Sequence, residues 1–173
     1  MVSSTVIPVS EYLNTSYRPD RDYLDGELKE RNMGEQPHAR LQMILGRIFD
    51  VKRREWGIRV LAEQRIQTSA EHYRIADVCV LRSSDPKDPI VRFAPLLCVE
   101  ILSKDDSVGE LQERVNDYAG LGVEHIWTIE PWKRLGYVAS RRGFLQPADG
   151  VLRIAGTGIE VGLAELFAEL DES

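Results

Sequence analysis

The sequence predicts a mixed α+β fold in a single domain that spans residues 1–173. The length of 173 residues is close to the roughly 150 residues typical of one domain. Hydrophobic residues make up 43% of the chain and charged residues 29%, which are ordinary values for a globular protein. Helical and strand periodicities also alternate along the chain, and no repeat or long linker divides it. Together these observations favour a layered arrangement of sheet and helices around one core.

The chain begins with a short helix, a hairpin and a longer helix. Residues 8–13 predict the short helix, which Pro8 starts favourably. Residues 22–31 predict a hairpin, because Asp25-Gly26 is a typical tight-turn dipeptide. Residues 36–52 carry apolar side chains at the spacing of one buried helical face: Leu41, Ile44, Leu45, Ile48 and Phe49.

Three strands follow. Residues 58–66 alternate apolar and polar side chains, and residues 74–81 are rich in strand-forming types. Residues 94–102 are apolar on both faces, which is typical of a central strand. The prolines between residues 82 and 96 predict a long loop there.

Further helices and strands are predicted in the C-terminal part of the chain. Residues 107–121 show helical spacing of apolar side chains, and the glycines around residue 121 end that helix. Residues 124–129 predict a strand, and residues 135–154 a β-meander that turns at Asp149-Gly150. Residues 162–169 predict a terminal helix.

Composition excludes several classes of protein. The net charge of −6 and the pI near 5.2 exclude a wholly basic nucleic-acid coat protein, although not a local basic groove. Two cysteines are too few for a disulfide-rich secreted scaffold. No apolar run approaches the roughly 18 residues of a membrane span. The N-terminus lacks the pattern of a signal peptide, so we expect a cytoplasmic protein without a membrane partner.

Two acidic residues, Asp77 and Glu100, interrupt apolar strand faces. Each lies in the middle of a stripe with period two, formed by Ile75, Cys79 and Leu81 in one strand and by Leu96, Cys98 and Leu102 in the other. A carboxylate buried there costs several kcal/mol unless it is paired or bound to metal. Oxygen ligands of this kind suit Mg²⁺ or Mn²⁺. The alternative is that each acid forms a structural ion pair with Arg65, Arg74 or Arg114.

Short motifs around these acids, in order, resemble the Uma-type family of putative restriction endonucleases, within the PD-(D/E)XK nuclease superfamily. The resemblance covers roughly residues 8–168. Its motifs are Tyr23, Asp25-Gly26-Glu27, His38, Arg74-Ile75-Ala76-Asp77, Val99-Glu100-Ile101-Leu102-Ser103, Tyr118, Gly122-Val123, Trp127 and Ile129-Glu130-Pro131.

The resemblance implies a restriction-endonuclease-like core of helix, three strands, helix and strand, with an N-terminal hairpin and a C-terminal β-meander. It also implies a metal-dependent endonuclease that hydrolyses phosphodiester bonds of DNA, with Mg²⁺ (or Mn²⁺) as cofactor. Asp77 then corresponds to the first metal-binding acid and Glu100 to the second. In this superfamily a lysine normally stabilises the developing charge or helps to deprotonate the attacking water.

The chain departs from that pattern near both acids. Ala76 replaces the proline that usually precedes the first acid, and Leu102 occupies the usual lysine position. The lysine that the family carries on the following helix corresponds to Arg114, which can contact a phosphate but cannot act as a base. Lys104 is the other candidate cation. The alternatives are a helix-surface pair of Arg114 with Glu110 and a solvated Lys104.

Three further polar residues are candidates for a supporting role. His38 could bind phosphate or orient a ligand, or could serve as a core or capping residue. Glu27 could add an outer carboxylate, or could be an exposed strand residue. Gln64 could hydrogen-bond a metal-bound water, or could lie on an edge strand.

The acidic balance and the missing lysine leave a second function open. A non-catalytic nuclease-fold module for interaction or nucleic-acid binding would need neither a basic residue at the acids nor a bound metal. For DNA binding by a nuclease, a homodimer could concentrate the basic residues Lys52, Arg53, Arg54 and Arg59 along one groove.

Overall fold

A mixed eight-stranded sheet forms the centre of the computed structural model, which describes residues 6–32 and 35–172. The strand order is β2-β1-β4-β5-β6-β7-β8, and β3 pairs with β4 off that path. The strands are β1 (Asp22–Leu24), β2 (Glu27–Lys29), β3 (Ile58–Ser69), β4 (His72–Arg82), β5 (Leu97–Ile101), β6 (Ile126–Glu130), β7 (Leu135–Ser140) and β8 (Gly143–Leu145). The helices are α1 (Val9–Asn14), α2 (Gln36–Val51), α3 (Arg53–Trp56), α4 (Val108–Leu121) and α5 (Leu163–Asp171).

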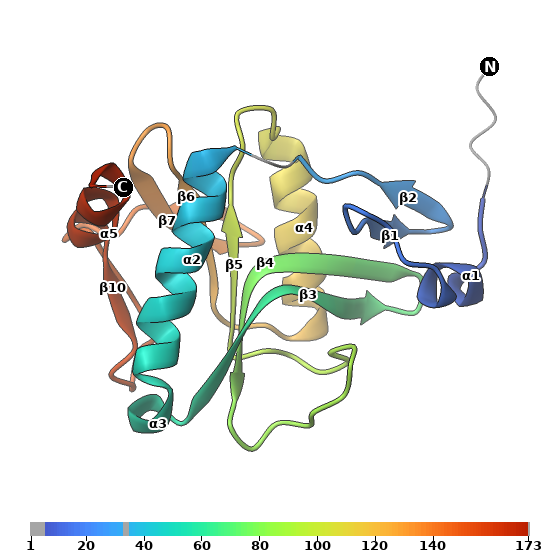
Figure 1. Ribbon diagram of the computed structural model, residues 1–173, viewed down its shortest axis with the longest axis horizontal. Helices are drawn as coiled ribbons and strands as arrows, with labels where there is room; N and C mark the ends of the chain where they lie inside the picture. The colour runs from blue at the N-terminus through green and yellow to red at the C-terminus, as the bar shows by residue number, and fades with distance from the viewer. Residues whose placement is uncertain (1–5, 33–34, 173) are drawn as a thin grey trace.

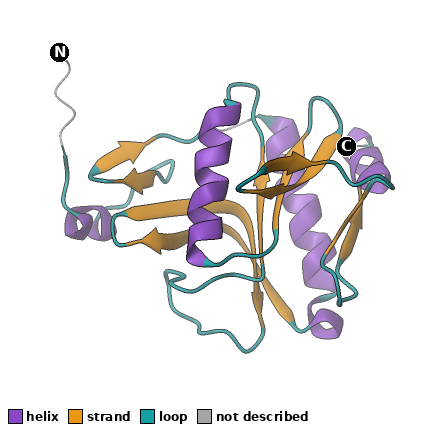
Figure 2. Ribbon diagram, turned by 180° about the vertical axis from the view of Figure 1, so that it is seen from behind, coloured by secondary structure: helices purple, strands orange, loops and turns teal. Residues whose placement is uncertain are grey.

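Helices α2 and α4 cover opposite faces of this sheet (Figures 1 and 2). The apolar stripe of α2 packs with α5 and with Trp127 of β6 in the larger core cluster. On the other face, α4 packs Val115 and Tyr118 against Cys79 and Cys98. The sheet is therefore buried on both sides at its centre, as expected for strands that are apolar throughout.

The ends of α2 and α4 follow from local sequence. Pro37 lies in the first turn of α2, where a missing N–H costs nothing. Ser107 caps α4 and accepts a hydrogen bond from the Glu110 N–H at 3.1 Å. Gly122 ends α4 with φ of 103°, a conformation that favours glycine.

Strands β5 and β6 run parallel, and α4 forms the crossover between them. Their carboxyl ends therefore lie at the same edge of the sheet. The Leu102 N–H donates to the Ile129 carbonyl at 2.8 Å and extends this pairing beyond β5. Helix α2 begins at the same edge, at the top of Figure 1. This edge thus collects the start of α2 and the segments that follow β5 and β6.

The predicted fold class and the predicted core order are confirmed, including the long loop between β4 and β5. The predicted β-meander is wrong in its last part. Strand β9 (Val151–Arg153) leaves the main sheet and pairs with β10 (Glu160–Gly162) in a separate two-stranded sheet. The reason is burial, because Leu152 and Val161 pack in the core cluster that α2 and α5 share. Helix α3 and strand β10 were not predicted.

No helix within the described residues is both long and apolar enough to cross a membrane.

Replacing Trp127 by alanine should lower the free energy of unfolding by about 3–5 kcal/mol, because the change leaves a cavity in the larger core. Urea denaturation of the purified variant measures this loss. Trp132→Ala is the matched control, because Trp132 is 41% exposed and should cost less than about 1 kcal/mol. Equal losses in the two variants would contradict the described core.

Candidate functional site

Asp77 and Glu100 lie where the ladder between β4 and β5 ends. The two strands pair through residues 78–80 and 97–99. The Cys98 N–H donates to a carbonyl just before β6 at 3.1 Å, so it points away from β4. In an antiparallel ladder this marks Cys98 as a non-hydrogen-bonded position, the type in which facing side chains lie closest. Asp77 and Glu100 follow this ladder, just beyond its last pair, and they lie close enough for the charge of Asp77 to act on Glu100.

The carboxylate of Asp77 is 1% exposed and is fully engaged by hydrogen bonds and charges. Its Oδ2 accepts from the Ile101 N–H at 2.7 Å and lies 3.3 Å from His38 Nε2. Its Oδ1 pairs with the guanidinium of Arg31. Burial acts to raise the pKa of Asp77, but the hydrogen bond from His38 and the charge of Arg31 outweigh it and lower the pKa.

The pKa of His38 changes in the opposite sense. Burial acts to lower this pKa, but the hydrogen bond to Asp77 and the charge of Asp77 raise it above its ordinary value. The imidazole therefore favours the protonated form beside the ionised carboxylate.

Glu100 is also 1% exposed, and two side chains of α4 hold it. Arg114 donates to Oε2 at 2.7 Å, and the Tyr118 hydroxyl donates to Oε1 at 2.6 Å. Burial, together with the like charge of Asp77, raises the pKa of Glu100 to about 7 in spite of Arg114. The two acids thus differ in environment, since the pKa of Asp77 is lowered and that of Glu100 is raised.

A chain of charges continues from Glu100 to the N-terminal hairpin. Arg114 Nε lies 3.9 Å from Asp22 Oδ2, and Asp22 is itself buried. Asp22 accepts from the Ile75 N–H at 3.0 Å and pairs with Arg74 at 3.1 Å. Arg74 in turn donates to Asp117 of α4 at 2.7 Å. Ion pairs therefore connect strand β1, strand β4 and helix α4 beside the acids.

Two of the residues expected near the acids are found there. His38 contacts Asp77, and Arg114 contacts Glu100. The alternative of a helix-surface pair between Arg114 and Glu110 is wrong, because the Arg114 guanidinium pairs with the buried Glu100 at 2.7 Å. Arg114 points toward the sheet because it lies on the same side of α4 as the buried Tyr118.

Three candidate residues are not brought to the acids. Lys104 is exposed, and its Nζ lies 3.8 Å from the ring centroid of Trp132. Glu27 is exposed on β2, which β1 separates from β4. The Gln64 amide donates to two backbone carbonyls, at 2.9 and 3.0 Å, and one of them belongs to the loop before β5.

Sequence reasoning missed Arg31, the partner of Asp77. Of the partners expected for the acids, Arg65 pairs instead with Asp20 at 2.6 Å. Arg31 follows the hairpin in a run of charged residues, and no periodicity marks it as buried. Gln42 was also missed, and its amide donates to the Asp77 backbone carbonyl at 2.8 Å.

The donor chemistry of the acid pair fits a hard divalent cation. Within residues 6–32 and 35–172, no group of three or more His, Cys, Asp or Glu side chains is arranged to hold a metal ion. Mg²⁺ usually takes only one or two carboxylates and keeps several waters, so two neighbouring carboxylates suffice. Because Arg31 and Arg114 already contact these oxygens, a bound cation would compete with both guanidinium groups for them.

Comparisons with known proteins identify a matching family and a solved structure of similar fold. The model of the Uma2 family, described as "Putative restriction endonuclease", matches residues 10–150. A crystal structure of a putative nuclease of the DUF820 group from Anabaena variabilis superposes with a TM-score of 0.81 at 21% identity, covering 95% of this chain and 99% of that one. This likeness shows a shared fold.

A second solved structure matches more weakly. The cryoEM structure of the DrdV–DNA complex gives a TM-score of 0.45 at 14% identity, covering 78% of this chain and 12% of that one. The search of curated proteins finds no match.

Arg114→Ala should lower the free energy of unfolding by about 3–5 kcal/mol, because it leaves the buried Glu100 without its counter-charge. The double variant Arg114→Ala/Glu100→Gln should lose less, because no uncompensated charge remains. Urea denaturation measures both losses, with the exposed Arg142→Ala as control. A double variant that is less stable than the single one would contradict the pairing.

Proposed function

Because the chain belongs to the Uma2 family of putative restriction endonucleases, we propose that it is a metal-dependent endonuclease that hydrolyses phosphodiester bonds in DNA. The observation that carries this proposal is the pair of buried, neighbouring carboxylates, Asp77 and Glu100, at the end of the β4–β5 ladder. Phosphodiester hydrolysis needs a positive charge that offsets the negative charge of the phosphate. Two carboxylates are suitable ligands for a divalent cation that would supply this charge.

Asp77 and Glu100 would hold Mg²⁺ or Mn²⁺. When bound, such an ion offsets phosphate charge and lowers the pKa of a coordinated water. The surrounding residues orient the two carboxylates. The Ile101 N–H and His38 fix Asp77, while Tyr118 fixes Glu100. Second partners of this kind set the direction in which a ligand oxygen points.

Arginines take the place of the family's lysine in this proposal. Arg31 and Arg114 stay protonated, so either can contact a phosphate oxygen but neither can take a proton from water. Because Arg114 is held against Glu100, it also positions that carboxylate. Because neither arginine can deprotonate the attacking water, we expect the activity to be weak under ordinary conditions.

A non-catalytic nuclease-fold module is the second candidate function. It is favoured by the complete pairing of both acids, since Arg31 and Arg114 already neutralise Asp77 and Glu100. Isothermal titration with Mn²⁺ separates the two candidates. A nuclease should bind the ion at these acids, and a module whose acids serve only as ion pairs should not. The cytoplasmic location and the homodimer stay predictions.

Asp77→Asn should abolish Mn²⁺-dependent cleavage of duplex DNA, because an amide is a poorer ligand and carries no charge. A gel assay of supercoiled plasmid measures cleavage, and EDTA should stop it in the unaltered protein. The matched control is Asp105→Asn, an exposed acid in the loop after β5, which should cleave normally. Cleavage that survives both Asp77→Asn and EDTA would exclude this site.

Arg114→Lys should retain or raise turnover, because lysine keeps the cation and can also release a proton. Arg114→Ala should lower turnover by about 10²-fold or more, the usual scale for loss of one charge contact in the transition state. Turnover is measured per folded molecule, since Arg114→Ala also destabilises the fold. An unchanged rate in the alanine variant would remove Arg114 from the site.

A further inference from the structure

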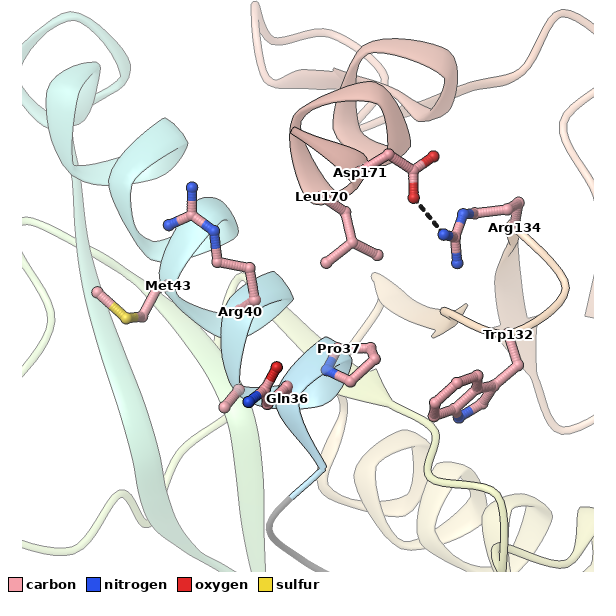
Figure 3. Close-up of a pocket in the computed structure, with 9 residues that line it drawn as sticks. Gln36, Pro37, Arg40, Met43, Trp132, Arg134, Leu170 and Asp171 are labelled. Atoms are coloured by element: carbon pink, nitrogen blue, oxygen red, sulfur yellow. Dashed lines mark hydrogen bonds and ion pairs between the residues drawn. The ribbon is translucent and has the colours of Figure 1, made fainter. Parts of the chain in front are cut away.

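A groove of about 650 Å³ lies between the start of α2 and the turn that follows β6. Its walls come from the first two turns of α2, the turn after β6 and the end of α5 (Figure 3). A volume of this size is typical of small-molecule sites. The groove is assembled from three segments that are distant in the sequence.

One cation in the groove has no counter-charge. Arg40 of α2 is half-buried, and its Nε is buried without a hydrogen-bond partner. Among residues 6–32 and 35–172, no acidic side chain pairs with Arg40. Arg134, by contrast, is paired with Asp171 across the groove, as Figure 3 shows. A buried N–H without a partner is costly, and an anionic ligand that accepts from Arg40 Nε would relieve that cost.

Apolar side chains lie beside this cation on the surface. Met43 is 70% exposed and Trp132 is 41% exposed, and both line the groove. The ammonium of Lys104 lies over the Trp132 ring, 3.8 Å from its centroid, and adds a second cation at the groove. Aromatic and apolar surface next to cations is the combination that binds the bases and phosphates of single-stranded nucleic acid.

The same turn of α2 borders both the groove and the acid pair. Pro37 and Ala39 line the groove, while His38 between them reaches Asp77 at 3.3 Å. Lys104 follows Glu100 by four residues, at the edge where β5 and β6 both end. A polymer that lies with one phosphate at the acids therefore has the groove next to it.

We propose that this groove binds one unstacked nucleotide of the nucleic-acid substrate, next to the bond that is cleaved. Its base packs against Trp132, and its phosphate contacts Arg40. The inference rests on the proposed function for its class of substrate, but it concerns binding and not hydrolysis. It can therefore be tested without metal and without turnover.

The test measures binding of a fluorescein-labelled single-stranded DNA of about 12 nucleotides in EDTA, by fluorescence anisotropy. Trp132→Leu should raise the dissociation constant about tenfold, the scale of one lost base–aromatic stack. Arg40→Ala should weaken binding and reduce the salt slope of log K by about 0.7, as expected for one lost phosphate contact on a single strand. Arg54→Ala, an exposed arginine beyond the other end of α2, is the matched control and should bind normally.

A second readout comes from tryptophan fluorescence. Binding should quench part of the emission of the unaltered protein. Trp132→Leu should lose that quenching, because Trp127 is fully buried and Trp56 lies in α3, beyond the other end of α2. Circular dichroism checks that the variants stay folded.

The outcomes separate this inference from the proposed function. No binding by the unaltered protein, or equal binding by all variants, overturns the groove whether or not DNA is cleaved. Selective loss in Trp132→Leu and Arg40→Ala supports the groove even if Asp77→Asn shows that cleavage arises elsewhere. Equal weakening by Arg54→Ala would mean general charge attraction and would also overturn the groove.

Discussion

The rest of the site depends on one hydrogen bond, in which the Asp77 carboxylate accepts from the Ile101 N–H. An antiparallel ladder would normally satisfy that N–H with a backbone carbonyl of the neighbouring strand. Here the side chain does so, and the backbone carbonyl of Asp77 accepts instead from Gln42 of α2. The Ile101 N–H and the Asp77 carbonyl both keep partners, so β4 and β5 stop pairing here without leaving either group as a buried orphan. The end of the ladder is thus a stable feature and not a frayed one.

The charges that this arrangement buries are compensated from elements outside the central strands. Arg31 comes from the segment before α2, and Arg114 comes from α4. Through Asp22, Arg114 also reaches the hairpin that forms one edge of the sheet. Buried ion pairs contribute little net stability, but removing one partner is expensive. Separating these peripheral elements from the acids would therefore cost more free energy than forming the ion pairs contributes to stability.

Local periodicity predicted most of the helices and strands and marked the two acids as interruptions of apolar strand faces, because alternation and helical spacing are local properties. The spacing of Arg114 relative to Tyr118 was likewise enough to direct it toward the acids. Arg31 could not be found in this way, since its burial depends on the path of an irregular segment across the sheet. The departure of β9 from the main sheet depends on burial of Leu152 against distant helices, and the groove joins three remote segments. These features are products of tertiary packing, which a single sequence does not display.

The long reach of these contacts bears on the order in which the chain folds. Arg31 and Asp77 are separated by 46 positions, and Arg74 and Asp22 by 52. Closing loops of that size costs chain entropy before any contact compensates it, so such contacts form late compared with helices and tight turns. Until α2, the hairpin and α4 have docked, the acids have no partners and the groove has no walls. A chain still emerging from the ribosome would thus carry the residues of the site without the site itself.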